Sequence, residues 1–318
     1  MYDVIALGEL LIDFASRSVD ADGYPTMAAN PGGAPGNFLA ALNAYGKKTA
    51  FLGKVGDDAF GHLLLGTLTR AGIETKGVLV DPKVFTTLAF VTFDDTGDRS
   101  FSFARKPGAD TQLCWEEVDK SMIDGAKIFH FGTLSLTDEP ARSTTQQAIA
   151  YAKAQGKLIT CDPNLRKPLW RTMEEAKQQI LWSLQQADVV KVSDEEVEFL
   201  WDCTPEEGAE KLLQECGVSL AMVTLGPDGC LLKTKAASCR IPGPKVTPID
   251  TTGAGDIFGG SAVSRLLDLD KTIADLTEED LHYIGSYATV AASLSTETLG
   301  GIPSIPEKAA VLERMGTL

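Results

Sequence analysis

The alternation of short apolar runs with longer stretches of helical periodicity constrains the fold more than any other feature of this sequence. Val4–Leu7 is apolar throughout, which is typical of a strand that is buried on both faces. Strands are expected at 4–7, 128–134, 158–161, 189–192 and 221–225, and helices at 38–45, 59–70, 141–154 and 174–186. Strands separated by helices of this length form a parallel sheet covered by helices on both faces. The pattern therefore predicts an α/β fold.

Two segments interrupt this alternation and predict a smaller sheet. Residues 86–93 and 100–105 have the composition of two short strands, and residues 94–98 between them favour a turn. Residues 15–34 are polar and contain glycine. We expect these segments, approximately 15–34 and 86–105, to form a small sheet that acts as a lid and excludes water. An ordinary surface hairpin is the alternative.

Composition and charge exclude several classes of protein. The 318 residues are 44% hydrophobic and 23% charged, as in ordinary globular proteins, and we expect residues 1–318 to form a single domain. The net charge of −15 argues against a nucleic acid or an anionic membrane as partner, because phosphate-rich surfaces attract clustered lysine and arginine. The six cysteines are scattered, which favours structural thiols over zinc or disulfide use. With no signal peptide and no apolar run near the roughly 20 residues that span a bilayer, the sequence predicts a cytoplasmic enzyme.

The most informative stretch is Asp-Thr-Thr-Gly-Ala-Gly-Asp at residues 250–256, which runs into a small and apolar segment. Glycines that open a helix leave backbone N–H groups free, and these groups form an anion site together with the helix dipole. A carboxylate at such a site would repel phosphate, so it is not expected to bind it. It can instead serve as a general base that accepts the proton of an attacking hydroxyl. Asp256 is therefore the candidate base. A loose dinucleotide fingerprint and a plain helix cap are the alternatives.

The two signatures of one kinase family are matched in the correct order. The sequence contains neither a P-loop nor the His-Arg-Asp and Asp-Phe-Gly motifs of protein kinases. Residues 250–256 instead resemble the C-terminal signature of the ribokinase-like sugar kinases, the PfkB family. Pro-Gly-Gly-Ala-Pro-Gly-Asn at 31–37 and Gly-Lys-Val-Gly-Asp-Asp-Ala-Phe-Gly at 53–61 resemble the N-terminal signature. The resemblance runs from residue 8 to residue 303 and is greatest to the bacterial fructokinases.

This resemblance implies a fold, a reaction and a catalytic set. The fold is a three-layer α/β/α ribokinase-like domain with a mainly parallel central sheet and a β-sheet lid, and the reaction transfers a phosphoryl group from ATP to a primary hydroxyl with Mg²⁺ as cofactor. Asp256 matches the family's base, and Gly253, Ala254 and Gly255 match its anion hole. Arg166 follows an apolar strand, at the sheet edge where α/β proteins bind ligands, and its guanidinium is expected to hold the transferred phosphate. A surface salt bridge is the alternative for Arg166.

The resemblance also implies a set of sugar ligands. These are Asp13, Gly32, Gly33, Asn37 and Arg105, with Asp256 completing the site. Asp13 would accept hydrogen bonds from hydroxyls, and the glycines would let the backbone approach the sugar closely. Read without the family, Asp13 is a turn residue at a strand end, residues 32–37 are a turn and a helix start, and Arg105 is a solvated strand residue.

A further set of residues matches the nucleotide and metal sites of the family. The nucleotide residues are Lys191, Glu196, Thr224, Gly226 and Gly229. Glu196 belongs to a motif that organises Mg²⁺ through water, but Ser193 stands where the family usually has asparagine. Helix capping is the alternative for this acidic segment, and a turn between two strands is the alternative for 224–229. A K⁺ site found in many members is matched by Asp250, Thr252, Gly300 and Ser304.

The leading hypothesis is therefore a fructokinase, which makes D-fructose 6-phosphate and ADP from D-fructose and ATP. Kinases for 2-keto-3-deoxygluconate, aminoimidazole riboside or another ribosyl compound share the same catalytic half and remain alternatives. A catalytically silent, sugar-binding regulator on the same fold is the alternative from another class. The expected partners are a small sugar and a second copy of the chain, bound through the lid.

Overall fold

The computed structural model describes residues 1–93 and 99–316. The turn predicted at 94–98 lies outside the described residues. Within them, a nine-stranded sheet has the order β13-β12-β11-β10-β9-β8-β1-β4-β5. Its strands are β1 Tyr2–Leu7, β4 Thr49–Gly56, β5 Glu74–Asp81, β8 Ala126–Gly132, β9 Leu158–Asp162, β10 Val189–Ser193, β11 Leu220–Thr224, β12 Cys230–Lys233 and β13 Ser238–Ile241. All the neighbouring pairs from β5 to β11 are parallel, whereas β12 pairs antiparallel to both β11 and β13.

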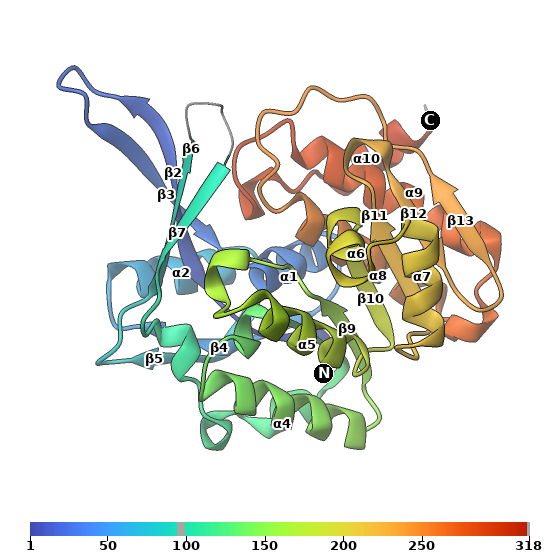
Figure 1. Ribbon diagram of the computed structural model, residues 1–318, viewed down its shortest axis with the longest axis horizontal. Helices are drawn as coiled ribbons and strands as arrows, with labels where there is room; N and C mark the ends of the chain where they lie inside the picture. The colour runs from blue at the N-terminus through green and yellow to red at the C-terminus, as the bar shows by residue number, and fades with distance from the viewer. Residues whose placement is uncertain (94–98, 317–318) are drawn as a thin grey trace.

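Helices cover both faces of this sheet (Figure 1). One face packs against α3 Lys120–Asp124, α4 Ala141–Ala154, α5 Met173–Leu184, α6 Asp194–Trp201 and α7 Pro205–Gln214. The other packs against α1 Ala34–Ala44, α2 Ala59–Arg70, α8 Ala254–Leu269 and α9 Glu278–Ser295, with α10 Lys308–Met315 against α9. Alternate residues of β1 enter opposite cores: Ile5 and Leu7 pack on one side, and Val4 and Ala6 on the other. This double burial is why β1 is a continuous apolar run, and it confirms the predicted α/β fold.

A second, four-stranded sheet stands off the main body, with the order β3-β2-β6-β7 (Figure 1). Its strands are β2 Leu11–Val19, β3 Pro25–Gly32, β6 Thr87–Phe93 and β7 Arg99–Ala104. β2 pairs parallel to β6, and the other two pairs are antiparallel. The two segments predicted to leave the main sheet thus meet in one small sheet. It begins at Leu11 and not at residue 15, because the apolar start of β2 is already paired with β3 and β6.

Most predicted elements are present, and the differences have local causes. The helix predicted at 59–70 has these bounds, and Asp58 caps it by accepting from the N–H groups of Phe60 and Gly61. α1 begins at Ala34, before the predicted residue 38, because Pro35 lies in the first turn, where a missing N–H costs nothing. Leu134 belongs to a 3₁₀ turn and not to strand β8, which ends at Gly132. Strands β4, β5 and β13 were not predicted, whereas β12 is the strand that the turn interpretation of 224–229 implies.

The structure also describes the state of the cysteines and the character of the helices. All six cysteines are unpaired, and Cys161, Cys216, Cys230 and Cys239 are buried. These four cysteines belong to the hydrophobic core, and the structural role expected for the thiols stays a prediction. Among the described residues, no helix combines the length and the apolarity that crossing a membrane requires.

Candidate active site

The start of helix α8 presents backbone N–H groups at the carboxyl edge of the main sheet. Gly253 precedes the helix with a φ of 77°, in the left-handed region that favours glycine. A Cβ at this position would lie 3.0 Å from the Cα of Gly301 and 3.2 Å from the Nδ2 of Asn37. The first N–H groups of a helix have no intrahelical acceptor. The glycine stretch therefore forms a helix N-terminus where the sequence predicts an anion site, and its role in binding an anion stays a prediction.

Asp256 lies in the first turn of α8, and its carboxylate is held by a residue from the opposite end of the chain. The Nδ2 of Asn37, on α1, donates to the Oδ2 of Asp256 at 2.8 Å. The pKa of Asp256 is raised to about 7, mainly by burial and also by the charge of Asp162, and these two effects outweigh the lowering effects of Asn37, Lys191 and Arg166. A carboxyl group with a pKa near neutrality is suited to accept a proton under physiological conditions.

A buried ion pair lies beside this base. The Nζ of Lys191, on β10, is 3.1 Å from the Oδ2 of Asp162 at the end of β9, and the two side chains are 10% and 9% exposed. Burial alone would lower the pKa of Lys191, but the negative charges of Asp162, Glu196 and Asp256 raise it above its ordinary value. Lys191 is therefore protonated and offsets the acids around it. The other oxygen of Asp162 is buried and has no hydrogen-bond partner among the described residues.

Asp13 lies within strand β2, so the interpretation as a turn residue is wrong. Its carboxylate leans over Gly32, where an added Cβ would overlap the Oδ2 of Asp13. The pKa of Asp13 is raised to about 6, mainly because the group is buried; the charge of Arg166 opposes this rise and that of Asp250 adds to it. Arg166 thus acts electrostatically on both Asp13 and Asp256, as a cation placed between a sugar and a transferred phosphate would.

Gly33 precedes α1, whose first residue, Ala34, donates its N–H to the Oε1 of Glu9 at 3.0 Å. Glu9 is 2% exposed, and burial raises its pKa to about 7. Glu9 was not predicted as a site residue, although it lies two residues after the end of the buried strand β1. By holding the start of α1, it helps to position Asn37 and, through Asn37, Asp256.

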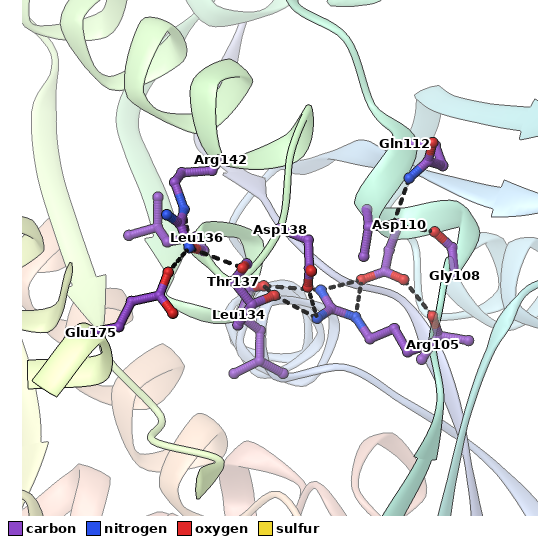
Figure 2. A network of polar contacts seen from close by, with 12 residues as sticks. Arg105, Gly108, Asp110, Gln112, Leu134, Leu136, Thr137, Asp138, Arg142 and Glu175 are labelled. Carbon is purple, nitrogen blue, oxygen red and sulfur yellow. Dashed lines mark hydrogen bonds and ion pairs between the residues drawn. The ribbon is translucent and has the colours of Figure 1, made fainter. Parts of the chain in front are cut away.

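Arg105 is buried in a polar network, so the interpretation as a solvated strand residue is wrong (Figure 2). Its Nε donates to the Oδ2 of Asp110 at 2.8 Å, its Nη1 to the Oγ1 of Thr137 at 2.6 Å, and its Nη2 to the carbonyl of Leu134 at 2.9 Å. The other oxygen of Asp110 accepts from Thr87, the first residue of β6. One carboxylate therefore joins the two strand ends at the base of the β6–β7 hairpin. The donors of Arg105 are used within the protein, so its predicted contact with a sugar stays a prediction.

Glu196 forms a capping box with Ser193 at the start of α6. Its Oε2 accepts from the N–H of Ser193 at 2.9 Å, and its Oε1 accepts from the N–H of Leu165 at 2.8 Å. The capping alternative is thus confirmed. The second bond also ties α6 to the loop that carries Arg166, so Glu196 lies beside the ion pair of Lys191 and Asp162.

The residues predicted for the nucleotide loop and those predicted for the cation site form two separate groups. Thr224 ends β11, and Gly226 and Gly229 lie in the turn to β12, as the turn interpretation predicts. The Oδ1 of Asp250 accepts from the N–H of Thr252 at 3.0 Å, and its Oδ2 accepts from the N–H of Gly300 at 2.9 Å. Ser304 donates to the carbonyl of Gly301, which adjoins Gly253. The four predicted cation residues thus lie in two adjoining loops behind the anion site.

A carboxylate beside a helix N-terminus, with a buried lysine close to it, is the arrangement expected of a phosphotransferase that acts on a hydroxyl group. The family model described as "pfkB family carbohydrate kinase" matches residues 1–308. The chain belongs to this family and is a carbohydrate kinase.

Individual relatives agree with this assignment. Fructokinase-2 of Solanum lycopersicum is 40% identical over 95% of this chain and 93% of its own. Fructokinase from Xylella fastidiosa, solved with bound ATP, has a TM-score of 0.91 and 28% identity over 100% of this chain and 99% of its own. Fructokinase from Vibrio cholerae, solved with fructose, ADP and calcium ion, has a TM-score of 0.87 and 32% identity over 98% of each chain.

Proposed function

We propose that this chain phosphorylates D-fructose at its C6 hydroxyl with ATP and releases D-fructose 6-phosphate and ADP. The observation that carries the proposal is the hydrogen bond from Asn37 to Asp256 at the glycine-rich start of α8. It aims a carboxylate with a raised pKa at a site for phosphate. The fructokinases similar to this chain, one of them solved with fructose, favour this sugar over the alternatives.

In the proposed mechanism Asp256 accepts the proton of the C6 hydroxyl. The oxygen attacks the γ-phosphorus of ATP, and the bond from that phosphorus to the bridging oxygen of ADP breaks. The N–H groups of residues 253–255 and the guanidinium of Arg166 stabilise the negative charge that spreads over the transferred phosphoryl group. Asp13, Gly32, Gly33 and Asn37 form the sugar site, with Arg105 at the base of the lid. Closure of the small sheet over the sugar would exclude water.

The acidic residues beside the anion site fit a divalent cation. The free oxygen of Asp162 and the carboxylate of Glu196, the latter through water, are the groups that would hold Mg²⁺. When bound, Mg²⁺ neutralises charge on the β- and γ-phosphates. Lys191, Thr224, Gly226 and Gly229 would contact the rest of the nucleotide.

A monovalent cation is proposed for the loops that contain Asp250, Thr252, Gly300 and Ser304. Oxygen ligands from these loops suit K⁺ more than a transition metal. A cation there would stabilise the anion site, since Gly301 contacts Gly253. Initial rates in potassium buffer should exceed those in sodium or choline buffer, and equal rates in all three would refute the cation site.

Two wider features are proposed with the activity. Val19 and Tyr24, at the tip of the β2–β3 hairpin, are 65% and 68% exposed, which supports a homodimer formed through the small sheet. Analytical ultracentrifugation of the wild-type chain and a Val19→Asp, Tyr24→Asp variant tests this, because a dimer made by the hairpin should dissociate in the variant.

The unpaired cysteines support a reducing, cytoplasmic location.

The substrate is tested by ADP release with Mg-ATP across fructose, ribose, 2-keto-3-deoxygluconate and aminoimidazole riboside. The proposal expects the highest kcat/KM with fructose. Higher turnover with another sugar would replace fructose as the substrate. Sugar binding without turnover on any of them would favour the catalytically silent regulator.

A further inference from the structure

The face of the small sheet that carries Asp13 also carries a polar side chain with no assigned role. Strand register places Asn30 of β3 directly opposite Asp13 of β2. Residues opposed in this way point to the same face, with Cβ atoms about 5 Å apart. Phe14, the neighbour of Asp13 along β2, points to the other face, where its ring packs on Phe60 of α2. Asn30 and Asp13 therefore share the face that turns away from α2.

This shared face looks toward the catalytic groups. Arg166 and Asp250 both act electrostatically on Asp13, and both belong to loops at the carboxyl edge of the main sheet. The carboxylate of Asp13 also leans over Gly32, which is two residues from Asn30 and on the same face of β3. Asn30, Asp13 and Gly32 thus form one continuous patch.

The amide of Asn30 makes no hydrogen bond within the part of the chain that the structure describes, although the residue is half-buried. The asparagines of α1 differ, because Asn37 donates to Asp256 and Asn43 donates to the carbonyl of Gly72. An amide offers two donors and one acceptor, and a half-buried amide is stabilised when a ligand or water satisfies them.

We propose that Asn30 is a specificity-determining residue of the sugar site, whose amide hydrogen-bonds a sugar hydroxyl beside the one that Asp13 binds. The inference rests on the proposed function and narrows its substrate class. A carboxylate only accepts hydrogen bonds, whereas an amide also donates, so the pair recognises two adjacent hydroxyls of an uncharged sugar. An anionic group placed there would be repelled by Asp13.

The first test compares the steady-state kinetics of Asn30→Ala with those of the wild-type enzyme on D-fructose. Loss of one hydrogen bond should raise KM for fructose about fivefold to tenfold, while KM for ATP stays within about twofold. Thr26→Ala is the matched control, since it removes a polar group from the exposed part of the same strand, away from Asp13. It should leave all constants unchanged. Asn30→Ser repeats the comparison with a small polar side chain. Melting curves of all the variants show whether each of them is folded.

Deoxy analogues of fructose separate a direct contact from a structural role. We expect one of 1-, 3- and 4-deoxyfructose to bind the wild-type enzyme more weakly and to be insensitive to Asn30→Ala, because its missing hydroxyl is the partner of the amide. Equal effects of the substitution on fructose and on all three analogues would overturn the inference. So would an unchanged KM for fructose.

The identity of the sugar substrate is tested separately from the role of Asn30. If the wild-type enzyme prefers another sugar of the panel, the assignment of fructose fails, and the same variants are compared on that sugar. A KM for that sugar that is raised only in the Asn30 variants supports the inference, and a KM that is unchanged refutes it.

Discussion

At the scale of single residues, the active site depends on charges that are buried together. Asp256, Asp162 and Lys191 belong to three different segments of the chain, which the fold brings together at one edge of the main sheet. Desolvation raises the pKa of the base, and the adjacent lysine and arginine limit how far it rises. The pKa of Asp256 is therefore set first by its burial and is adjusted by the charges and the hydrogen bond around it.

The pKa of Asp256 predicts the pH dependence of the reaction. A base must be deprotonated to act, so raising the pH through about 7 should increase kcat/KM until it levels off. Below that pH, log kcat/KM should fall with a slope of about one or more, because Asp13 and Glu9 also bind protons between about pH 6 and 7. A profile that stays flat from pH 5 to 8 would contradict the raised pKa.

Removing the cation beside the base should move this profile. In Lys191→Met the pKa of Asp256 loses an opposing charge and rises, so the increase in kcat/KM should shift to higher pH. The variant should also lose roughly 3–5 kcal/mol in the free energy of unfolding, since Asp162 is left buried without its partner. Denaturant unfolding and pH–rate profiles measure both effects. Lys235→Met, at an exposed position, is the control and should change neither.

At the scale of secondary-structure elements, the small sheet is attached to the body at a defined point. Asp110 joins Thr87 at the start of β6 to Arg105 just after β7, and Arg105 continues the contacts to the loop after β8 (Figure 2). Arg142 carries the network on to Glu175 of α5 through an ion pair of 2.6 Å. The base of the hairpin is thus held to the main body by these contacts.

Breaking this attachment should impair both stability and sugar binding. Asp110→Asn leaves the guanidinium of Arg105 buried without its main countercharge, which should cost roughly 3–5 kcal/mol in the free energy of unfolding. KM for the sugar should rise more than KM for ATP, because the small sheet carries Asp13. Asp138→Asn is the control: its side chain is 43% exposed and 3.6 Å from Arg105, so it should cost about 1 kcal/mol or less. Equal losses in the two variants would refute a special role for Asp110.

At the scale of the whole molecule, the sequence predicts what depends on local pattern and misses what depends on packing. The hydrophobic pattern identifies β1, β9, β10 and α4. A strand that is buried on both faces is a continuous apolar run, and a helix that is buried on one face has apolar residues at helical spacing. The glycine-rich start of α8 is equally visible. Edge strands such as β5 and β13 are partly exposed and carry a weaker signal.

The site is only partly visible in the sequence for the same reason. Asn37 and Asp256 are 219 positions apart, and only the packing of α1 on α8 shows that they touch. The burial of Arg105 and the contact of Glu9 with the start of α1 likewise arise from tertiary structure. Residue types predicted which groups could act, and the fold determines which of them act together.

The most direct test of the account is the activity of Asp256→Asn, measured as sugar-dependent ADP release with Mg-ATP. The asparagine oxygen can still accept the hydrogen bond from Asn37, so the fold and the binding of sugar and nucleotide, followed by calorimetry, should be retained. If Asp256 is the base, kcat should fall by about 10²–10⁴-fold, the usual contribution of a general base. Retention of kcat within tenfold of the wild-type value, with binding intact, would show that another group accepts the proton.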